Sequence, residues 1–521
     1  MLSPIFQKDL KRLDLLKMPL SPVERQVKIA VYRNHSFEMV AGVLNVFLNC
    51  SGMAANFTFS DYDDSLNFTP VEADINLIWI DAKRYKISNL NDFLNERAAV
   101  LRAGAKSPIL IAYTGEKQNL SSKVPDTYFW CVEDDLADLE GSAFDEAKEA
   151  YSGTRLSSKA MLECARVLGM RYIPALLYPP LKAIVCDLDN TLYQGVLGED
   201  GMDGLIANND LQRQIKTLKE QGFFLCIASK NEEADVRRLF EKRTDFVLRW
   251  EDFTAVAINW DAKADNILKL AETLNIGTDA MLFIDDNPAE LQNVEATGVQ
   301  KLLADKDVCQ VLKYCPRLLK LRKSTEDGLR SKDVQANIQR AKLAAAMSPR
   351  EYFEKLKIKL IYNIDNTNQI PRVSELLNKT NQFILSYKRY KEADVEKFMA
   401  DSDKCLITVQ MSDNLSDSGV IAILAAHAEN NILIADELTV SCRALGRNLE
   451  NVMLPEMFRL AGETLGAGET MEIPYKKGER NGPALTWLKS LVNTDLEDVG
   501  TALFSIPDKI DLSGLTVEVK K

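Results

Sequence analysis

Residues 184–201 read IVCDLDNTLYQGVLGEDG, and this stretch places two carboxylates one residue apart at the end of an apolar run. The pattern predicts a buried β-strand that ends at Asp187 and Asp189. Ionised side chains this close repel each other and resist burial, so a cation should lie between them or solvent should reach them. Alternate side chains of a strand share a face, and open α/β sheets bind ligands at their carboxyl edge. This stretch is therefore the first candidate for a functional site.

Length and composition narrow the classes of protein. The 521 residues are too many for one core and suggest about three domains. The net charge of −12 without a long basic block argues against nucleic acid as a partner. The sequence has no apolar run of about 18 residues, so no membrane span is predicted. The nine cysteines are scattered and form no CxxC pair, which argues against a zinc site. The charged N-terminus lacks the apolar core of a signal peptide, so we expect a cytoplasmic protein with reduced thiols.

Strand-like and helix-like segments alternate along most of the chain, which predicts the α/β fold class. We divide the chain into an N-terminal α/β domain (1–178), an α/β core (179–320), a helical connector (321–350) and a C-terminal domain (351–521). The predicted strands are 27–33, 75–82, 107–115, 127–134, 182–189, 223–230, 246–250, 280–286, 405–412, 420–428 and 431–441. The predicted helices are 36–50, 142–170, 311–347, 370–380 and 448–465. Successive strands followed by a helix favour a mixed α+β sheet in the C-terminal domain.

Further polar residues lie at comparable places in the predicted core. They are Ser229 after one strand, Lys263 near a helix start, and Asp285, Asp286 and Asn287 after another strand. Carboxylates that converge on one sheet edge need a cation, and Mg²⁺ is the hard, oxygen-loving candidate. Beside Mg²⁺, one carboxylate can attack a phosphorus atom and a second can act as acid and base, while a hydroxyl and a lysine hold phosphate oxygens. The set predicts phosphoryl transfer.

This ordered set resembles the haloacid dehalogenase superfamily of phosphotransferases, whose motif hhhhDxDxT is matched by the run that ends at Thr191. The resemblance implies a Rossmann-like core in which Asp187 is the nucleophile and a Mg²⁺ ligand. It implies that Asp189 is the general acid and base, with its backbone carbonyl also on the metal. The other implied roles are loop ordering and phosphate binding by Thr191, phosphate binding by Ser229 and Lys263, metal binding by Asp285, and support from Asp286 and Asn287.

The spacing of the motifs leaves no room for a lid domain. The intervals 192–228 and 230–262 are both too short to hold one, and only a flap over 193–204 can cover the site. A lid excludes water from a small substrate. An open site suits a phosphate on a large molecule or a group on a carrier protein.

Wider segments resemble one subgroup of that superfamily, the FkbH-like proteins. The matching text includes DLDNTLYQGVLGEDG (187–201), FIDDNPAEL (283–291), KTNQFILSYKRYKEADV (379–395) and SCRALGRNLENV (441–452). The resemblance implies an SGNH-hydrolase-like N-terminal domain, a capless core and a C-terminal domain of acetyltransferase (GNAT) type. The best-known members load a glyceryl unit from 1,3-bisphosphoglycerate onto an acyl carrier protein through a thiol.

The chain departs from that pattern at the thiol. Leu188 stands between the two motif aspartates, where the family pattern implies a cysteine. Cys186 shares a strand face with Leu188 and is interpreted as a core residue, as is Cys226 in the middle of a strand. This departure argues against a glyceryl thioester and leaves phosphoryl chemistry intact.

The flanking domains also depart from active patterns. Ser36 follows the first strand, but no histidine occurs between His35 and His427, so Ser36 lacks a base and His35 is predicted to be structural. Arg443 and Gly446 match two marks of the acetyltransferase phosphate loop, and Arg447 could pair with a phosphate. These three residues are candidate CoA or phosphate ligands, unless they form a simple turn before a helix. Alternatively, the domain docks an acidic carrier protein through the basic residues Lys379, Lys388, Arg389 and Lys391.

We therefore expect a Mg²⁺-dependent phosphohydrolase or phosphotransferase that works through an aspartyl-phosphate on an open site. Its substrate should be phosphorylated, and large or carrier-bound. The alternative is FkbH-like transfer of a glyceryl or related acyl group to an acyl carrier protein. A third hypothesis is a non-catalytic scaffold that binds a carrier protein.

Overall fold

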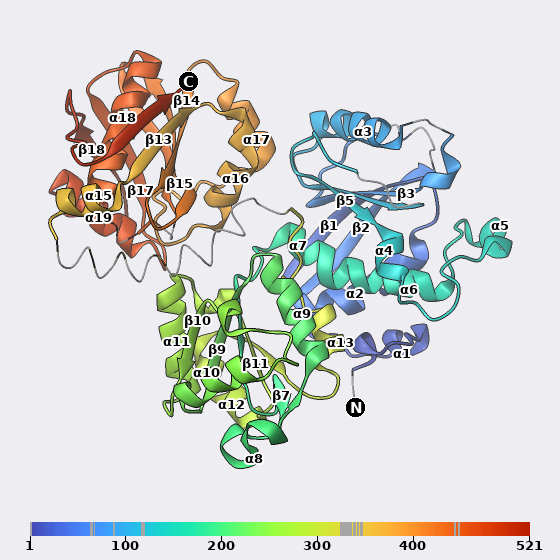
Figure 1. Cartoon of the computed structure of the whole chain (residues 1–521). Coiled ribbons are helices and arrows are strands. Elements are labelled where there is room, and N and C mark those ends of the chain that lie inside the picture. The colour runs from blue at the N-terminus through green and yellow to red at the C-terminus, as the bar shows by residue number, and fades with distance from the viewer. Residues whose placement is uncertain are drawn as a thin grey trace. The chain divides into compact units, whose positions relative to one another are not determined.

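The chain forms two compact units in the computed structural model (Figure 1). The structure describes residues 3–62, 66, 68–86, 89–115, 120–322, 336, 340, 343, 347–441, 444–445, 447 and 449–521. The first unit holds residues 1–181 and 304–322, and the second holds 182–303 and 323–521. The division into domains at 178, 320 and 350 stays a prediction.

A five-stranded parallel sheet forms the centre of the first unit. Its order is β2-β1-β3-β4-β5. The strands are β1 (Arg25–Arg33), β2 (Met53–Tyr62), β3 (Ile75–Asp81), β4 (Ile109–Thr114) and β5 (Thr127–Cys131). Helices α2 (Glu38–Leu48) and α6 (Ser158–Val167) pack on one face, and α3 (Leu90–Gly104) packs on the other. The α/β prediction is confirmed here, although β2 was not predicted, because polar residues interrupt the apolar ones in this edge strand and leave no continuous apolar run.

The predicted helix over 142–170 is wrong in its first half. The structure has a short helix α5 (Glu149–Ser152) and then a break before α6. Gly153 takes a left-handed conformation with φ of 69°, which ends α5. The hydroxyl of Ser157 then accepts a hydrogen bond from the Ala160 amide and caps α6.

A second five-stranded parallel sheet carries the motif residues. Its order is β10-β9-β6-β11-β12. The strands are β6 (Ala183–Cys186), β9 (Phe224–Ser229), β10 (Ala255–Ile258), β11 (Met281–Asp285) and β12 (Gln300–Leu303). Helix α11 (Lys263–Leu274) covers one face, and the connecting helices are α9 (Asn209–Glu220), α10 (Glu233–Lys242) and α12 (Pro288–Asn293). The parallel, Rossmann-like arrangement predicted for the core is confirmed.

The strand predicted over 246–250 is wrong. This apolar segment is a loop, and the strand that follows α10 is β10, at 255–258. Phe246 and Leu248 are nevertheless buried. The side-chain oxygen of Gln212 accepts hydrogen bonds from the amides of Val247 and Leu248, which replaces a strand ladder.

A small flap follows β6. Strands β7 (Tyr193–Gln194) and β8 (Ile206–Ala207) pair in antiparallel orientation, with α8 (Leu197–Gly204) between them. Gly195 begins this excursion with φ of 101°, a value that side chains rarely allow. The short flap agrees with the prediction that no lid domain follows the first motif.

The C-terminal part of the second unit is a seven-stranded mixed sheet. Its order is β18-β17-β16-β15-β14-β13-β19. The strands are β13 (Lys359–Ile364), β14 (Lys404–Ser412), β15 (Asp417–Glu429), β16 (Ile432–Val440), β17 (Thr470–Lys476), β18 (Val499–Ser505) and β19 (Thr516–Lys520). Helices α16 (Ile370–Lys379) and α17 (Glu392–Met399) pack on one face, and α15 (Pro349–Leu356), α18 (Glu450–Leu465) and α19 (Gly482–Val492) pack on the other. The mixed α+β prediction is confirmed.

Residues 304–322 return to the first unit. They contain α13 (Val308–Lys313), followed by Tyr314, whose ring is buried in the first core. The Tyr314 hydroxyl donates a hydrogen bond of 2.7 Å to Glu163. The prediction of a helix from 311 is wrong for 314–322, which are not helical.

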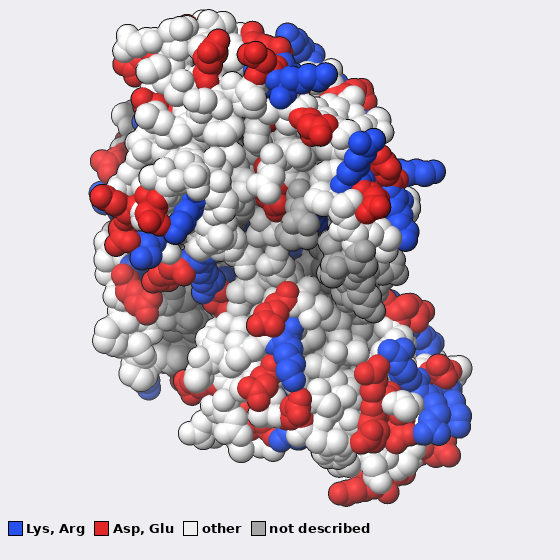
Figure 2. All heavy atoms as spheres, turned by 90° about the vertical axis from the view of Figure 1, so that its left-hand side faces the viewer, with Lys and Arg blue, Asp and Glu red and all other residues white. Residues whose placement is uncertain are grey.

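The surface shows mixed charge. Figure 2 shows acidic and basic side chains interspersed over the face that it presents. In the part of the chain that the structure describes, no helix is both long and apolar enough to span a bilayer.

Candidate active site

Three adjacent parallel strands bring the motif residues together at their carboxyl ends. Asp187 directly follows β6, while Ser229 and Asp285 are the last residues of β9 and β11. Strand β6 lies between the other two, and Cys186 pairs with both Ile227 and Ile284. The predicted convergence on one sheet edge is therefore observed.

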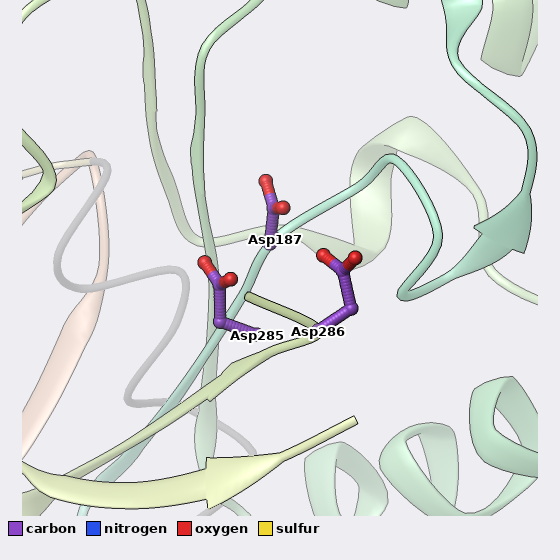
Figure 3. A group of neighbouring side chains, drawn as sticks. All are labelled: Asp187, Asp285 and Asp286. Atoms are coloured by element: carbon purple, nitrogen blue, oxygen red, sulfur yellow. The ribbon is translucent and has the colours of Figure 1, made fainter. Parts of the chain in front are cut away.

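The carboxylates of Asp187, Asp285 and Asp286 form a compact group. One oxygen from each lies within 4.8 Å of the others. Figure 3 shows the three carboxylate groups turned toward a common region beyond the strand ends. Asp187 and Asp285 are buried, and Asp286 is partly buried. A hard cation fits this set, because carboxylate oxygens are the ligands that Mg²⁺ prefers.

The ammonium of Lys263 lies against two of these carboxylates. Its Nζ atom is 3.0 Å from Oδ2 of Asp187 and forms an ion pair with Asp285. Lys263 is the first residue of α11 and is itself buried. The ammonium thus contacts two of the three carboxylates, and the remaining negative charge of the group favours a bound cation.

Burial and charge act in opposite directions on these groups. Burial raises the pKa of Asp187 to about 6; Lys263 counteracts this effect and Asp285 adds to it. Burial disfavours the Lys263 ammonium, but Asp187 and Asp285 outweigh it and raise the pKa of Lys263. Burial and the charge of Asp285 also raise the pKa of Asp286. A phosphate would therefore meet a lysine that keeps its positive charge.

The carboxylate of Asp189 accepts hydrogen bonds from the flap and from the loop after β9. Its Oδ1 atom accepts hydrogen bonds from the Tyr193 hydroxyl at 2.7 Å and from the Leu197 amide at 3.1 Å. Its Oδ2 atom accepts from the side-chain amide of Asn231 at 2.9 Å. Tyr193 and Leu197 belong to the flap, and Asn231 follows β9. The carboxylate of Asp189 therefore links the flap to the loop after β9.

Tyr193 and Asn231 were not predicted as site residues. The hydroxyl of Tyr193 is buried, and burial together with Asp189 raises its pKa well above the ordinary value. Asn231 also donates to the Ser229 hydroxyl at 3.3 Å. The only sequence signal for either residue is its spacing, four residues after Asp189 and two after Ser229.

The remaining predicted residues take supporting places. The Ser229 hydroxyl donates a hydrogen bond to Asp187. Thr191 is buried, and its hydroxyl has no hydrogen-bond partner among the described residues. The side-chain oxygen of Asn287 caps α12 by accepting a hydrogen bond from the Ala289 amide. The backbone amide of Asn287 donates a hydrogen bond of 2.8 Å to Asp285.

The thiols near the site are interior. Cys186 and Cys226 are fully buried, as is Leu188 between the two motif aspartates. Burial raises the pKa of the Cys226 thiol to about 12 and raises that of Cys186 further. Their interpretation as core residues is confirmed.

The polar residues after β1 do not form a nucleophile with a histidine base. The Ser36 hydroxyl donates to Glu38 at 2.7 Å, while Nδ1 of His35 lies 2.9 Å from the Thr154 hydroxyl. Partial burial disfavours the Glu38 carboxylate, but hydrogen bonds from Ser36 and Arg33 hold its pKa at about 2. A carboxylate with this pKa is too weak a base to activate a serine.

Arg447 is the only one of the three C-terminal candidates that lies among the described residues, and it is buried. Arg443 and Gly446 lie outside those residues. Arg447 is 2% exposed, and its guanidinium donates to the Ser418 hydroxyl at 2.9 Å. In the predicted basic patch, Lys379 pairs with Glu375, Lys388 pairs with Asp436, and Arg389 donates to backbone carbonyls. The two ion pairs reduce the positive charge that the patch offers to a partner.

Comparisons with known proteins give similar structures only. No family model and no curated protein matches the sequence. The N-terminal part of a Bacteroides fragilis protein, containing a phosphatase domain complexed with magnesium, is 21% identical with a TM-score of 0.43, over 58% of this chain and 93% of that one. A predicted phosphatase from Clostridium acetobutylicum is 13% identical with a TM-score of 0.22, over 26% and 92%. A haloacid dehalogenase family enzyme from Bacteroides thetaiotaomicron, a mutant in complex with magnesium and inorganic phosphate, is 11% identical with a TM-score of 0.19, over 24% and 93%. Similarity of this degree does not identify a reaction.

Proposed function

We propose that the protein is a Mg²⁺-dependent phosphohydrolase of the haloacid dehalogenase type. The observation that carries the proposal is the group of three carboxylates, Asp187, Asp285 and Asp286, with the ammonium of Lys263 against it. Asp187, Asp285 and Asp286 would hold the metal, together with the backbone carbonyl of Asp189. Bound Mg²⁺ would neutralise charge on the phosphate oxygens.

The side chains then divide the reaction into two steps. A carboxylate oxygen of Asp187 attacks phosphorus, and the bond from phosphorus to the ester oxygen breaks. Asp189 donates a proton to the leaving oxygen, and later accepts one from the water that attacks the phosphorylated Asp187. Lys263 and Ser229 hold phosphate oxygens. The products are an alcohol and inorganic phosphate, and the Asp187 carboxylate is restored.

Phosphate release from p-nitrophenyl phosphate tests this function. We expect wild-type turnover that needs Mg²⁺, and loss of at least about 1,000-fold in Asp187→Asn, because the nucleophile is gone. Asp261→Asn is the matched control, since Asp261 is exposed, pairs with Lys269 on the surface and lies in the loop before α11. A phosphorylated protein trapped by acid quench would support the intermediate. Equal release by wild type and Asp187→Asn would refute the proposal.

Acyl transfer to a carrier protein is the alternative. The buried thiols of Cys186 and Cys226, and Leu188 between the aspartates, count against a thioester at this site. Intact mass of an acyl carrier protein incubated with 1,3-bisphosphoglycerate and the enzyme tests it: an added glyceryl mass would favour transfer. A scaffold without catalysis predicts neither phosphate release nor an added mass.

The two flanking domains are proposed to have the folds that the family resemblance implies. The parallel α/β sheet of the first unit supports an SGNH-hydrolase-like fold, and the mixed sheet at the C-terminus supports a GNAT-like one. We propose no activity for either, given the surroundings of Ser36 and the burial of Arg447.

A further inference from the structure

The loop after β10 exposes a tryptophan beside the phosphate-binding lysine. Trp260 is 69% exposed and precedes Lys263 by three residues. Within the described part of the chain it is the only tryptophan with an exposed side chain. An indole gains free energy when its large apolar surface leaves water, so a ring held in solvent at an active-site edge is available to a ligand.

The ring is held in place. The indole N–H of Trp260 donates a hydrogen bond of 2.7 Å to Glu232. Asn259 stabilises the loop, because its side-chain oxygen accepts hydrogen bonds of 2.9 Å from the Asp261 amide and from Asn266. A ring that is already ordered loses little conformational entropy when a ligand binds.

The strand register places Trp260 near the reacting groups. Ile258 at the end of β10 pairs with Ser229 at the end of β9, and β9 is the neighbour of β6, which leads to Asp187. Adjacent strands lie roughly 4.8 Å apart, so β10 and β6 are separated by roughly 10 Å. The part of a substrate that extends along this edge from a phosphate on Asp187 would reach Trp260.

The chemistry of the ring restricts what it can bind. The single donor of the indole is used by Glu232, so the ring offers only its apolar faces and edges. The Glu232 carboxylate beside it repels anions. A planar or apolar group that carries no negative charge is therefore the complementary ligand.

We propose that Trp260 binds the leaving group of the phosphorylated substrate and selects for an aromatic or other planar unit without negative charge. This inference rests on the proposed phosphohydrolase function. It assigns Trp260 to substrate selection, with Glu232 as the residue that positions the ring.

Two substrates that differ in the leaving group test this assignment. We would measure kcat/KM for 2-naphthyl phosphate and for methyl phosphate with wild type, Trp260→Ala and Trp260→Phe. The ratio of kcat/KM for 2-naphthyl phosphate to kcat/KM for methyl phosphate should fall roughly 10-fold in Trp260→Ala, which is the size expected for one aromatic contact. Trp260→Phe should retain most of the ratio, because phenylalanine keeps an aromatic face. Leu268→Ala is the matched control on α11, with an exposed apolar side chain, and should not change the ratio.

A binding measurement separates this inference from the proposed function. Calorimetry should show that 2-naphthyl phosphate binds more weakly to the double variant Asp187→Asn, Trp260→Ala than to Asp187→Asn alone. An unchanged kcat/KM ratio, or a loss equal for both substrates, would overturn the assignment and leave the phosphohydrolase intact. Phosphate release that does not depend on Asp187 would instead overturn the proposed function. If wild type releases no phosphate, the calorimetric comparison alone decides the role of Trp260.

Discussion

His35 is a buried histidine that stays neutral. Its ring stacks on Trp79 with centroids 5.2 Å apart, and one nitrogen contacts the Thr154 hydroxyl. Burial lowers the pKa of His35 to about 3; Asp81 opposes this effect, and Arg84 and Arg155 add to it. Between about pH 6.5 and pH 3 the unfolded chain binds a proton here and the folded chain does not. The first unit should therefore lose stability as the pH falls through this window, by up to about 1.4 kcal/mol per pH unit.

Two measurements check this prediction. The chain has only two histidines, so the imidazole NMR signal of His35 can be assigned with His427→Asn and should not titrate between about pH 8 and pH 5. The free energy of unfolding in urea should depend less on pH in His35→Phe, which keeps a ring against Trp79 but cannot bind a proton. A His35 signal that titrates near pH 6.5 would contradict the prediction.

At the residue scale, the sequence identifies the charged site residues more readily than their partners. Asp187, Ser229 and Asp285 stand at strand ends, so the parallel sheet alone places them together. The contact between Tyr193 and Asp189 depends on how the flap turns back, which no periodicity encodes. Asp286 is predicted only as a supporting residue, whereas its carboxylate joins the group of three.

The flap tests the site at the scale of one element. Gly195 has φ of 101°, and a Cβ atom there would lie 2.9 Å from the Asp200 carboxylate. We expect Gly195→Ala to destabilise the flap by about 1–3 kcal/mol. Because the flap supplies two of the donors to Asp189, the kcat of phosphate release should fall with it.

Gly198 offers the matched control within the same flap. It lies in α8, and a Cβ atom there would meet no atom within 4 Å. Gly198→Ala should therefore leave the flap intact or stabilise it by about 0.5–1 kcal/mol, since alanine favours a helix over glycine. Hydrogen exchange of peptides over 193–207 measures both effects. Equal protection in the two variants would show that the conformation of Gly195 is not required.

Most elements follow from apolar runs, and the exceptions have physical causes. The buried strands of both parallel sheets are short apolar segments between turns, which is the pattern that sequence analysis detects well. Residues 246–250 share that pattern but form a loop in which Phe246 and Leu248 are buried, and Gln212 replaces the hydrogen bonds of a ladder. Apolar content reports burial, and it does not say which partner satisfies the backbone.

At the scale of the whole chain, the polypeptide leaves the first unit at residue 181 and returns to it at 304. The predicted boundary at 320 rests on a helical, Lys- and Arg-rich stretch that is interpreted as a connector, and a local sequence pattern does not show which core a later residue joins. Tyr314 is 2% exposed and packs into the first core, where the Arg166 guanidinium lies 4.0 Å from the centre of its ring. The segment that follows β12 thus contributes to the stability of the first unit.

Tyr314→Ala tests that dependence. Removing a buried aromatic ring leaves a cavity and leaves Glu163 without one of its donors, so we expect the first unit to lose about 3–5 kcal/mol of stability. Tyr314→Phe keeps the ring and should lose only about 1–2 kcal/mol, the cost of the missing hydrogen bond. Hydrogen exchange of peptides from β1 and β3 reports this loss directly. Tyr151→Ala is the control, because Tyr151 is 93% exposed in the same unit. The hydrogen-exchange protection of β1 and β3 could instead be equal in Tyr314→Ala and Tyr151→Ala. In that case residues 304–322 do not hold the first unit together, and the returning segment is only a linker.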